Sequence, residues 1–300
     1  MEISGSGLAG RIAAVGLLAV SLGGVAVYLR PSEAARLAMR ARLLASGARE
    51  GRVAVDRLPV RYFDSRPGRG DGEAMVLVHG LGGHAESWAA VMPKLSRGTR
   101  VLAPDIAGFG GTDAPPEGMS FSSLTKCLGG FLDEMGIRRA VLVGNSLGGA
   151  VSIKYVARHP ERVERLFLLN SAGLLDEAPS SLEPDNREEA RELWGITAGS
   201  RTALPNFFLD DMVRRAKSPA RRAYLRSGEP TDVREDLPRI EAPTTIIWGA
   251  RDGLIPRSHG EEMRAAIPVS ELVMLPEAAH VPQIQAPEEV VSIIRGRLAS

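Results

Sequence analysis

The chain has 300 residues, of which 44% are hydrophobic and 24% are charged, and its net charge at pH 7 is +1. This composition is typical of a folded protein and excludes a disordered chain, and it lacks the basic excess expected of a nucleic-acid-binding protein. The one cysteine, Cys127, cannot form an internal disulfide, and no cysteine and histidine spacing indicates a zinc site. We therefore expect no nucleic-acid partner and no metal, and we place Cys127 in the core.

The first element in chain order is an uncharged segment, residues 12–29, that is long enough for a transmembrane helix. More positive charge follows this segment than precedes it, which predicts a membrane anchor over residues 1–30 with the rest of the chain in the cytoplasm. The alternative is a signal peptide cleaved after Gly24-Val25-Ala26, which would give a secreted or periplasmic protein. Residues 31–52 are interpreted as a basic juxtamembrane linker, either on an anionic membrane surface or as a solvated helix.

Short apolar runs alternate with helical patterns through most of the remaining chain. Residues 53–63 predict a strand or hairpin, and buried strands are predicted at 75–79, 100–105, 140–145, 165–170, 244–249 and 271–275. Helices are predicted at 84–94, 122–136, 147–158, 258–266 and 287–298. This alternation predicts an α/β fold with a doubly wound, mostly parallel sheet that binds ligands at the carboxyl ends of its strands.

One interval, residues 171–240, has no convincing strand but contains three helical patterns. We interpret it as a helical cap inserted into the core. The core would then consist of a first part, residues 53–170, and a second part, residues 241–300.

Ser146 is the candidate nucleophile. It lies in the sequence Gly144-Asn145-Ser146-Leu147-Gly148, between a predicted strand and a predicted helix. Such a pattern is weak by itself, but the strand–turn–helix context is the one that a nucleophile elbow requires. The glycines allow the sharp bend and the close approach of strand and helix.

A serine nucleophile needs a base and an acid. His280 follows the last predicted strand and is the candidate base. The other histidines lie in glycine-rich loops or near helix ends: His79, His84, His159 and His259. Asp252 follows the strand at 244–249 and is the candidate acid, because the other possible position, after the preceding strand, holds Asn170. Asp105 also ends a strand, but the glycine-rich turn that it begins predicts a role in shaping the wall of the site.

The third requirement is a pair of donors for the oxyanion. The backbone N–H of Leu147 lies at the start of the helix after Ser146, where the helix dipole also favours negative charge. The second donor is expected from the sequence HGLGG, in which the N–H of Leu81 can face the elbow.

These motifs resemble those of the α/β-hydrolase superfamily over roughly residues 53–300. The resemblance rests, in this order, on HGLGG, DIAGFGGTD, GNSLGG, RHPERVERLFLLN, IIWGARDGLIP and AAHVPQIQAPEEV. It implies Ser146, Asp252 and His280 as catalytic triad and the amides of Leu81 and Leu147 as oxyanion hole. Within the superfamily the chain is most similar to membrane-anchored monoacylglycerol lipases and bacterial lipases and esterases.

The resulting hypothesis is a cofactor-independent serine hydrolase of carboxylic esters, with acyl lipids such as monoacylglycerols as substrates. The cap would supply an apolar acyl pocket from Leu193, Trp194, Phe207, Phe208 and Met212. Carbon–carbon bond hydrolases of aromatic-ring breakdown share GNSxGG and the triad, but typically have a tryptophan where this chain has Val281. A membrane-tethered binding protein with an inert Ser146 is the alternative from another class. The oligomeric state stays open.

Overall fold

The computed structural model describes residues 30–66, 73–174, 182–200 and 202–299. The predicted transmembrane segment, residues 12–29, lies outside these ranges. Within them, every helix is too short or too polar to cross a membrane.

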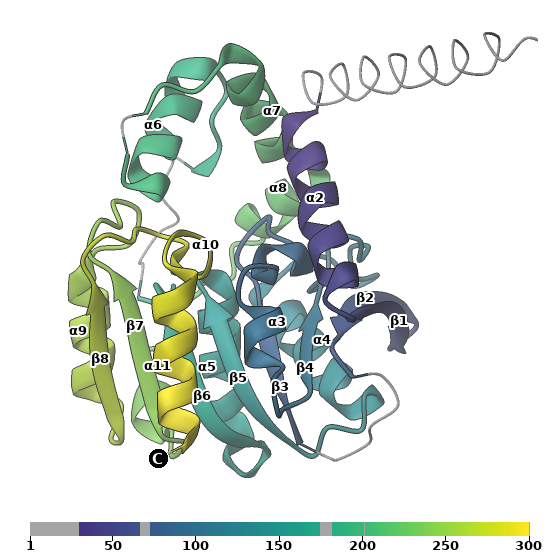
Figure 1. The fold of residues 1–300 in the computed structure, drawn as a ribbon, viewed down its shortest axis with the longest axis vertical. Coiled ribbons are helices and arrows are strands. Elements are labelled where there is room, and N and C mark those ends of the chain that lie inside the picture. The colour runs from purple at the N-terminus through teal and green to yellow at the C-terminus, as the bar shows by residue number, and fades with distance from the viewer. Residues whose placement is uncertain (1–29, 67–72, 175–181, 201, 300) are drawn as a thin grey trace, which may run out of the picture.

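An eight-stranded sheet, counted over the described residues, forms the centre of the fold in the order β1-β2-β4-β3-β5-β6-β7-β8 (Figure 1). The β1–β2 hairpin is antiparallel and β2 pairs antiparallel with β4, whereas all other neighbours are parallel. The mostly parallel sheet is therefore confirmed. The strands are β1 (Arg49–Val55), β2 (Leu58–Asp64), β3 (Glu73–Val78), β4 (Val101–Pro104), β5 (Arg139–Asn145), β6 (Val163–Leu169), β7 (Thr244–Gly249) and β8 (Ser270–Leu275).

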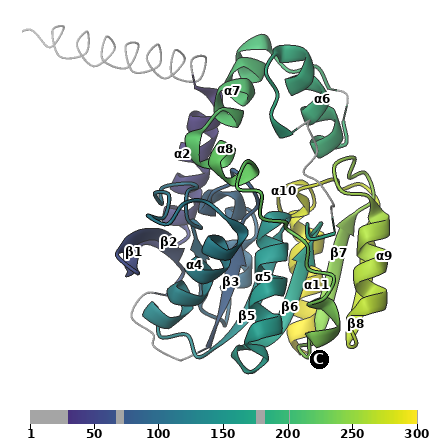
Figure 2. The same cartoon turned by 180° about the vertical axis from the view of Figure 1, so that it is seen from behind.

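Helices cover both faces of the sheet, which explains why its central strands are almost entirely apolar. On one face, α4 (Phe121–Glu134), α5 (Leu147–Arg158) and α9 (Arg257–Ala266) bury Leu124, Val151 and Met263 (Figure 2). On the other, α3 (Met92–Leu95) and α11 (Pro287–Ala299) pack in a second apolar cluster with Trp88, Met92 and Ile294 (Figure 1).

Two predicted boundaries differ from the structure. The first strand begins at Arg49 rather than at residue 53, because β1 pairs with β2 along its whole length from Arg49 to Val55. The helix predicted at 84–94 is wrong as a continuous element, since the chain forms a 3₁₀ turn, η1 (Ala85–Trp88), and the one-turn helix α3. Pro93 lies in this segment, and a proline is accepted at the first turn of a helix but not in its interior.

Between β6 and β7, the residues that the structure describes form three α-helices over the carboxyl end of the sheet: α6 (Arg187–Ala198), α7 (Asn206–Ala216) and α8 (Pro219–Leu225) (Figure 1). The side chain of Asn186 accepts hydrogen bonds from the backbone of Glu188 and Glu189 and so caps the start of α6. The left-handed Gly199 ends that helix.

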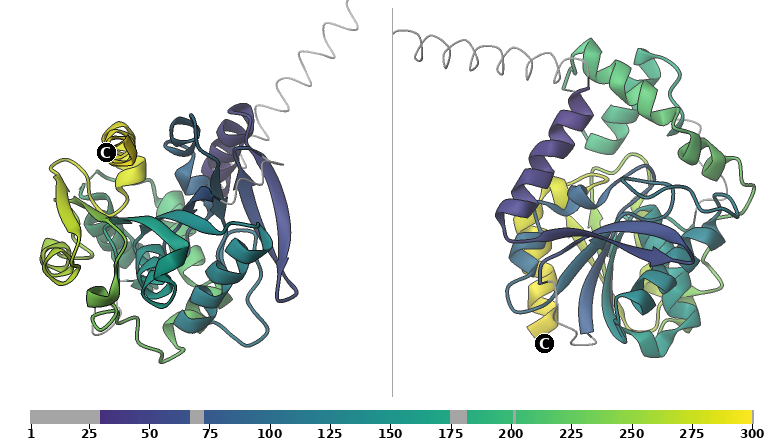
Figure 3. Two further views of the ribbon diagram at one scale, coloured as in Figure 1. Left: turned by 90° about the horizontal axis from the view of Figure 1, so that it is seen from below. Right: turned by 90° about the vertical axis from the view of Figure 1, so that its right-hand side faces the viewer.

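The segment predicted as a basic linker contains a helix, α2 (Pro31–Ala45), that runs from the β1–β2 hairpin to the cap (Figure 3). It contacts α7, η1 and β1. Its end is anchored by the completely buried Leu43, and the backbone N–H of Ser32 donates to Oδ2 of Asp211 in α7 at 3.1 Å. In this position α2 is packed against the domain along its length.

Candidate active site

Ser146 occupies a strained turn between β5 and α5. Its backbone has φ 54° and ψ −123°, a region that is costly for a residue with a side chain. Two glycines permit the turn: a methyl group on Gly144 would lie 2.5 Å from the carbonyl oxygen of Gly148, and one on Gly148 would lie 2.2 Å from that of Val78. The N–H of Ser146 donates to the carbonyl of Leu169 at 3.1 Å, which ties the turn to the neighbouring strand.

His280 and Asp252 form a hydrogen-bonded pair. Asp252 follows β7, His280 lies between β8 and α10 (Pro282–Gln285), and Nδ1 of His280 is 2.9 Å from Oδ2 of Asp252. The other carboxylate oxygen accepts hydrogen bonds from the backbone N–H groups of Leu254 and Ile255 at 2.8 and 3.1 Å. A carboxylate held in this way keeps the proton of the imidazole on Nδ1 and leaves Nε2 as the acceptor.

The two asparagines at the ends of β5 and β6 position this pair. The side-chain amide of Asn170 donates to Oδ2 of Asp252 at 2.7 Å, and its oxygen accepts from the N–H of Gly249 at 3.0 Å. Asn145 donates to the backbone carbonyl of His280 at 3.1 Å. Asn170 was predicted at a strand end but without a role. The signal for its role is the recurrence of asparagine at the ends of two neighbouring strands.

The residues predicted to supply the oxyanion donors belong to segments that pass beside Ser146. A methyl group on Gly80 would be only 3.0 Å from Cβ of Ser146, so the loop that carries Leu81 passes directly against the elbow. The N–H of Leu147 belongs to the first turn of α5, where helical N–H groups have no partner within the helix. Leu81, Leu147, Ser146 and His280 all line one cavity.

A buried histidine connects this loop, residues 79–88, to the turn after β4. Nδ1 of His79 donates to the carbonyl of Gly80 at 2.8 Å, while Nε2 accepts from the N–H of Ile106 at 3.1 Å. Burial lowers the pKa of His79, although nearby Asp105 opposes this shift. A neutral ring fits both contacts, because one nitrogen donates and the other accepts.

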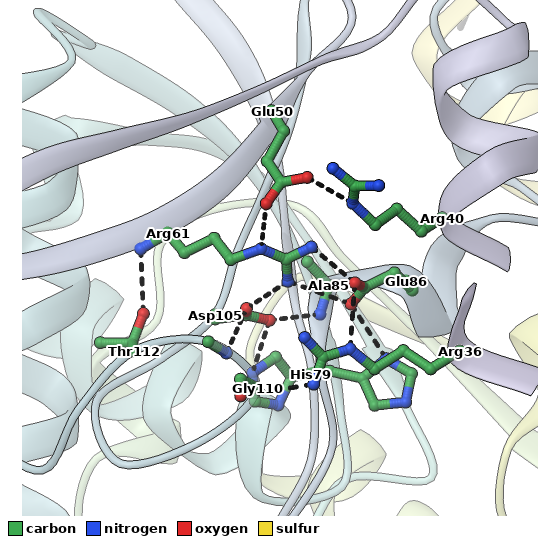
Figure 4. A network of polar contacts seen from close by, with 12 residues as sticks. Arg36, Arg40, Glu50, Arg61, His79, Ala85, Glu86, Asp105, Gly110 and Thr112 are labelled. Atoms are coloured by element: carbon green, nitrogen blue, oxygen red, sulfur yellow. Dashed lines mark hydrogen bonds and ion pairs between the residues drawn. The ribbon is translucent and has the colours of Figure 1, made fainter. Parts of the chain in front are cut away.

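A buried ion network centred on Arg61 holds the same loop from the side of the β1–β2 hairpin (Figure 4). The guanidinium of Arg61 contacts Glu86 at 2.5 Å, Asp105 at 2.6 Å and Glu50 at 2.7 Å. Burial lowers the pKa of Arg61, but the hydrogen bonds and charges of the three carboxylates outweigh it and raise the pKa overall. Asp105 also accepts from the N–H groups of Ala85 and Gly111, at 2.6 and 2.7 Å. The turn 105–113 was predicted to shape the wall of the site, but none of its residues lines the cavity over Ser146.

Two arginines of α2 join the network from outside. Arg36 reaches Glu86 at 3.2 Å, and Arg40 reaches Glu50 at 2.6 Å (Figure 4). Burial raises the pKa of Glu86, but hydrogen bonds from His84 and Arg61 outweigh it and lower the pKa overall. The loop with Leu81 is thus linked by charge to α2.

The cavity over Ser146 has a volume of about 620 Å³, the size of pockets that enclose small organic ligands. Its apolar lining includes two of the predicted pocket residues, Leu193 and Met212, but Trp194, Phe207 and Phe208 do not line it. Instead, the rings of Trp194 and Phe208 pack edge to face, with centroids 6.0 Å apart. Consecutive helical residues point in different directions, so Leu193 and Trp194 cannot face the same cavity.

The remaining reactive side chains lie away from this chemistry. Cys127 is buried in the core, and burial raises its pKa to about 11. His159 ends α5, and its ring packs against Tyr155 with centroids 4.8 Å apart. Among the described residues, no group of histidine, cysteine, aspartate and glutamate could hold a metal ion.

Comparison with known proteins agrees with this geometry. The model of the alpha/beta hydrolase family matches residues 75–293. The chain is 30% identical over 251 residues to a 2-hydroxy-6-oxo-2,4-heptadienoate hydrolase of Pseudomonas putida, with 77% of this chain and 91% of that protein covered. It is 29% identical over 243 residues to a dihydrolipoyllysine-residue acetyltransferase component of an acetoin cleaving system, also from P. putida. This match covers 77% of the chain but only 64% of that protein. The structure of a membrane phospholipase A, described as a bacterial virulence factor, superposes with a TM-score of 0.77 at 26% identity, covering 96% of this chain and 98% of the other.

Proposed function

The chain belongs to the alpha/beta hydrolase family, and on that premise we propose that it is a serine hydrolase of carboxylic esters, with acyl lipids such as monoacylglycerols as substrates. The observation that carries the proposal is the His280–Asp252 pair at the carboxyl edge of the sheet, which opens onto the same apolar cavity as the strained Ser146. Neither the elbow strain nor the buried Asp252 is required for packing the sheet, and both serve nucleophilic catalysis.

In the proposed mechanism, Oγ of Ser146 attacks the ester carbonyl while Nε2 of His280 takes its proton. Asp252 holds Nδ1–H and stabilises the imidazolium, and the N–H groups of Leu81 and Leu147 bind the oxyanion. His280 then gives its proton to the leaving alcohol. Water repeats these steps on the acyl-enzyme, so that the carboxylic acid is released and Ser146 is restored.

An acyl chain as the apolar part of the substrate is supported by the cavity itself. Its wall is formed in part by Leu193, Met212, Leu225 and Ile284, which offer no hydrogen bonds to a polar substrate. The structural similarity to a membrane phospholipase A points in the same direction. In this proposal, residues 12–29 anchor the cytoplasmic enzyme to the bilayer from which the lipid is taken.

A carbon–carbon bond hydrolase with the same triad is the second candidate. It is favoured by the similarity to the 2-hydroxy-6-oxo-2,4-heptadienoate hydrolase, whose name gives a 2-hydroxy-6-oxo-dienoate as the compound hydrolysed. In such a reaction the bond next to a ketone carbonyl would be cleaved instead of an ester bond. Val281 lies in the cavity wall at the position where such carbon–carbon bond hydrolases typically have a tryptophan, and this difference favours an ester substrate.

The test uses the full-length chain in detergent. A fluorophosphonate probe should label the wild type and the Ser87→Ala variant, which removes another serine of the cavity, but not the Ser146→Ala variant. Hydrolysis of p-nitrophenyl esters from two to sixteen carbons and of monoacylglycerols should likewise require Ser146. A labelled enzyme that cleaves no ester but cleaves 2-hydroxy-6-oxo-dienoates would establish the second candidate. A folded chain that no probe labels would be a binding protein.

A further inference from the structure

The wall of the cavity contains a positively charged side chain from the cap. Arg221 of α8 lines the wall, and its Nη2 donates to the backbone carbonyl of Leu182 at 2.6 Å. Its Nε is buried without a hydrogen-bond partner. A methyl group on Gly82 would lie 2.7 Å from Nη1, so the guanidinium packs against the loop that carries Leu81.

No carboxylate of the described residues lies within ion-pair distance of Arg221. Glu183, the acidic residue that acts on it, is instead 3.7 Å from Nε of Arg222. A second guanidinium approaches the same loop, because Nη2 of Arg215 in α7 donates to the carbonyl of Gly82 at 3.3 Å. Burial lowers the pKa of Arg221 and the nearby charge of Arg215 lowers it further, while Glu183 opposes this shift.

Among the described residues of the cavity wall, the acidic one is Glu229, and its carboxylate binds elsewhere. Glu229 accepts hydrogen bonds from the hydroxyl and the backbone N–H of Ser122 at the start of α4. Burial raises the pKa of Glu229, but the hydrogen bonds from Ser122 outweigh it and lower the pKa overall. The negative charge of Glu229 is thus stabilised at the N-terminus of α4, where backbone N–H groups favour an anion.

From these contacts we propose that Arg221 binds an anionic group of the substrate, so that the preferred substrates are acyl esters with a phosphate or carboxylate a few bonds from the scissile carbonyl. This inference rests on the proposed ester hydrolase activity. Free guanidinium N–H groups form short, charge-assisted hydrogen bonds to such oxygens. The acyl chain would occupy the apolar wall while the anionic group meets Arg221 beside the oxyanion loop.

The experiment compares matched esters on the full-length enzyme in neutral detergent. The pairs are 1-lauroylglycerol with its 3-phosphate, and lauroyl lactamide with lauroyl lactate, so that phosphate and carboxylate are read separately. The measured quantity is the ratio of kcat/KM for the anionic ester to kcat/KM for the neutral ester. The wild type should favour one anionic ester, and Arg221→Gln should lower that ratio by about 10- to 100-fold.

Two further variants separate charge from position. Arg221→Lys keeps the charge without the planar fork and should retain part of the preference. Arg226→Gln removes an exposed arginine at the end of the same helix and should leave kcat/KM unchanged for both the anionic and the neutral ester. A ratio that Arg221→Gln does not change, in an enzyme that cleaves the neutral esters through Ser146, would overturn the inference but not the proposed function. Absence of all ester hydrolysis would overturn both.

A measurement on the wild type guards against a variant that fails to fold. The ether analogues 1-O-dodecylglycerol and 1-O-dodecylglycerol 3-phosphate cannot be hydrolysed and should compete with a neutral p-nitrophenyl ester. We expect the phosphate to inhibit at a concentration at least about tenfold lower, with the advantage shrinking as salt is raised. The inference would be contradicted if the neutral ether and its phosphate inhibited equally, and if an ether that carries a carboxylate in place of the phosphate inhibited no better than the neutral ether.

Discussion

Replacing Arg61 by methionine tests the ion network behind the oxyanion loop. The side chain of Arg61 is 3% exposed, and its partners Glu86 and Asp105 are 0% exposed. Removing one partner from a buried ion pair costs about 3 to 5 kcal/mol, because the remaining charge loses its counterion without regaining water. We expect a loss at the lower end of this range, since Arg36 still contacts Glu86, and Asp105 keeps its bonds from Ala85 and Gly111.

The pH dependence of this loss gives a second check. Because the pKa of Glu86 is lowered in the folded protein, its contribution to stability is present above its unfolded pKa and is lost as the pH falls through the folded pKa. Without Arg61 the folded pKa of Glu86 should rise, so the variant takes up a proton earlier on acidification. The difference in stability between wild type and variant should therefore be largest at neutral pH and shrink toward pH 4.

Urea denaturation at pH 7 and at pH 4.5 measures both effects as changes in the free energy of unfolding. The control is Arg49→Met, which removes an exposed arginine from β1 and should change stability by less than about 0.5 kcal/mol. The Arg61→Met variant should also lose ester hydrolysis, because the loop that carries Leu81 is no longer held in place. A loss under about 1 kcal/mol, or one that is equal at the two pH values, would refute the reasoning.

Three further outcomes follow from the site and its surroundings. Asp252→Asn should keep the fold, checked by circular dichroism, but lower kcat by roughly 10³- to 10⁴-fold, because it favours the wrong tautomer of His280, the proposed base; a fall under tenfold would argue against Asp252 as the acid. Gly148→Ala should destabilise the protein or prevent folding, since the added methyl would lie 2.2 Å from a backbone oxygen, whereas Gly296→Ala in α11 meets nothing within 4 Å and should be neutral or stabilising in thermal melts. Burial raises the pKa of Cys127 to about 11, so iodoacetamide at pH 8 should modify the native protein at least about 100-fold more slowly than the urea-unfolded chain; equal rates would place the thiol at the surface.

The central strands and the elbow could be predicted because their constraints are local. Each buried strand needs an apolar run, and the turn at Ser146 needs glycine at the two positions where backbone meets backbone. The order of strand ends then predicts that residues at 146, 252 and 280 face one edge of the sheet. In the structure His280 and Asp252 are 2.9 Å apart, and His280 lines the same cavity as Ser146.

The cap could be predicted as helical but not in its orientation. Trp194 and Phe208 look like pocket residues by composition, yet their rings pack on each other while Leu193 and Met212 face the cavity. Which side of an amphipathic helix faces a cavity depends on the angle and the position at which the helix packs on its neighbours. The periodicity of the sequence predicts neither of these. The long-range partners of Arg36 and Arg40 escaped prediction for the same reason, since Glu86 lies 50 residues away from Arg36.

The two halves of the site are therefore held by different means. Asn145, Asn170 and the backbone of β5, β6 and β7 fix the proposed triad through hydrogen bonds between strand ends, which vary little when a side chain elsewhere changes. Part of the cavity wall is formed by side chains of α6, α7 and α8. These helices are joined to the core by contacts such as the hydrogen bonds of Thr197 with His280 and of Arg215 with Gly82. Substitutions at the strand ends should consequently lower turnover for every substrate, whereas those at Arg221 or Met212 should change which substrate is preferred.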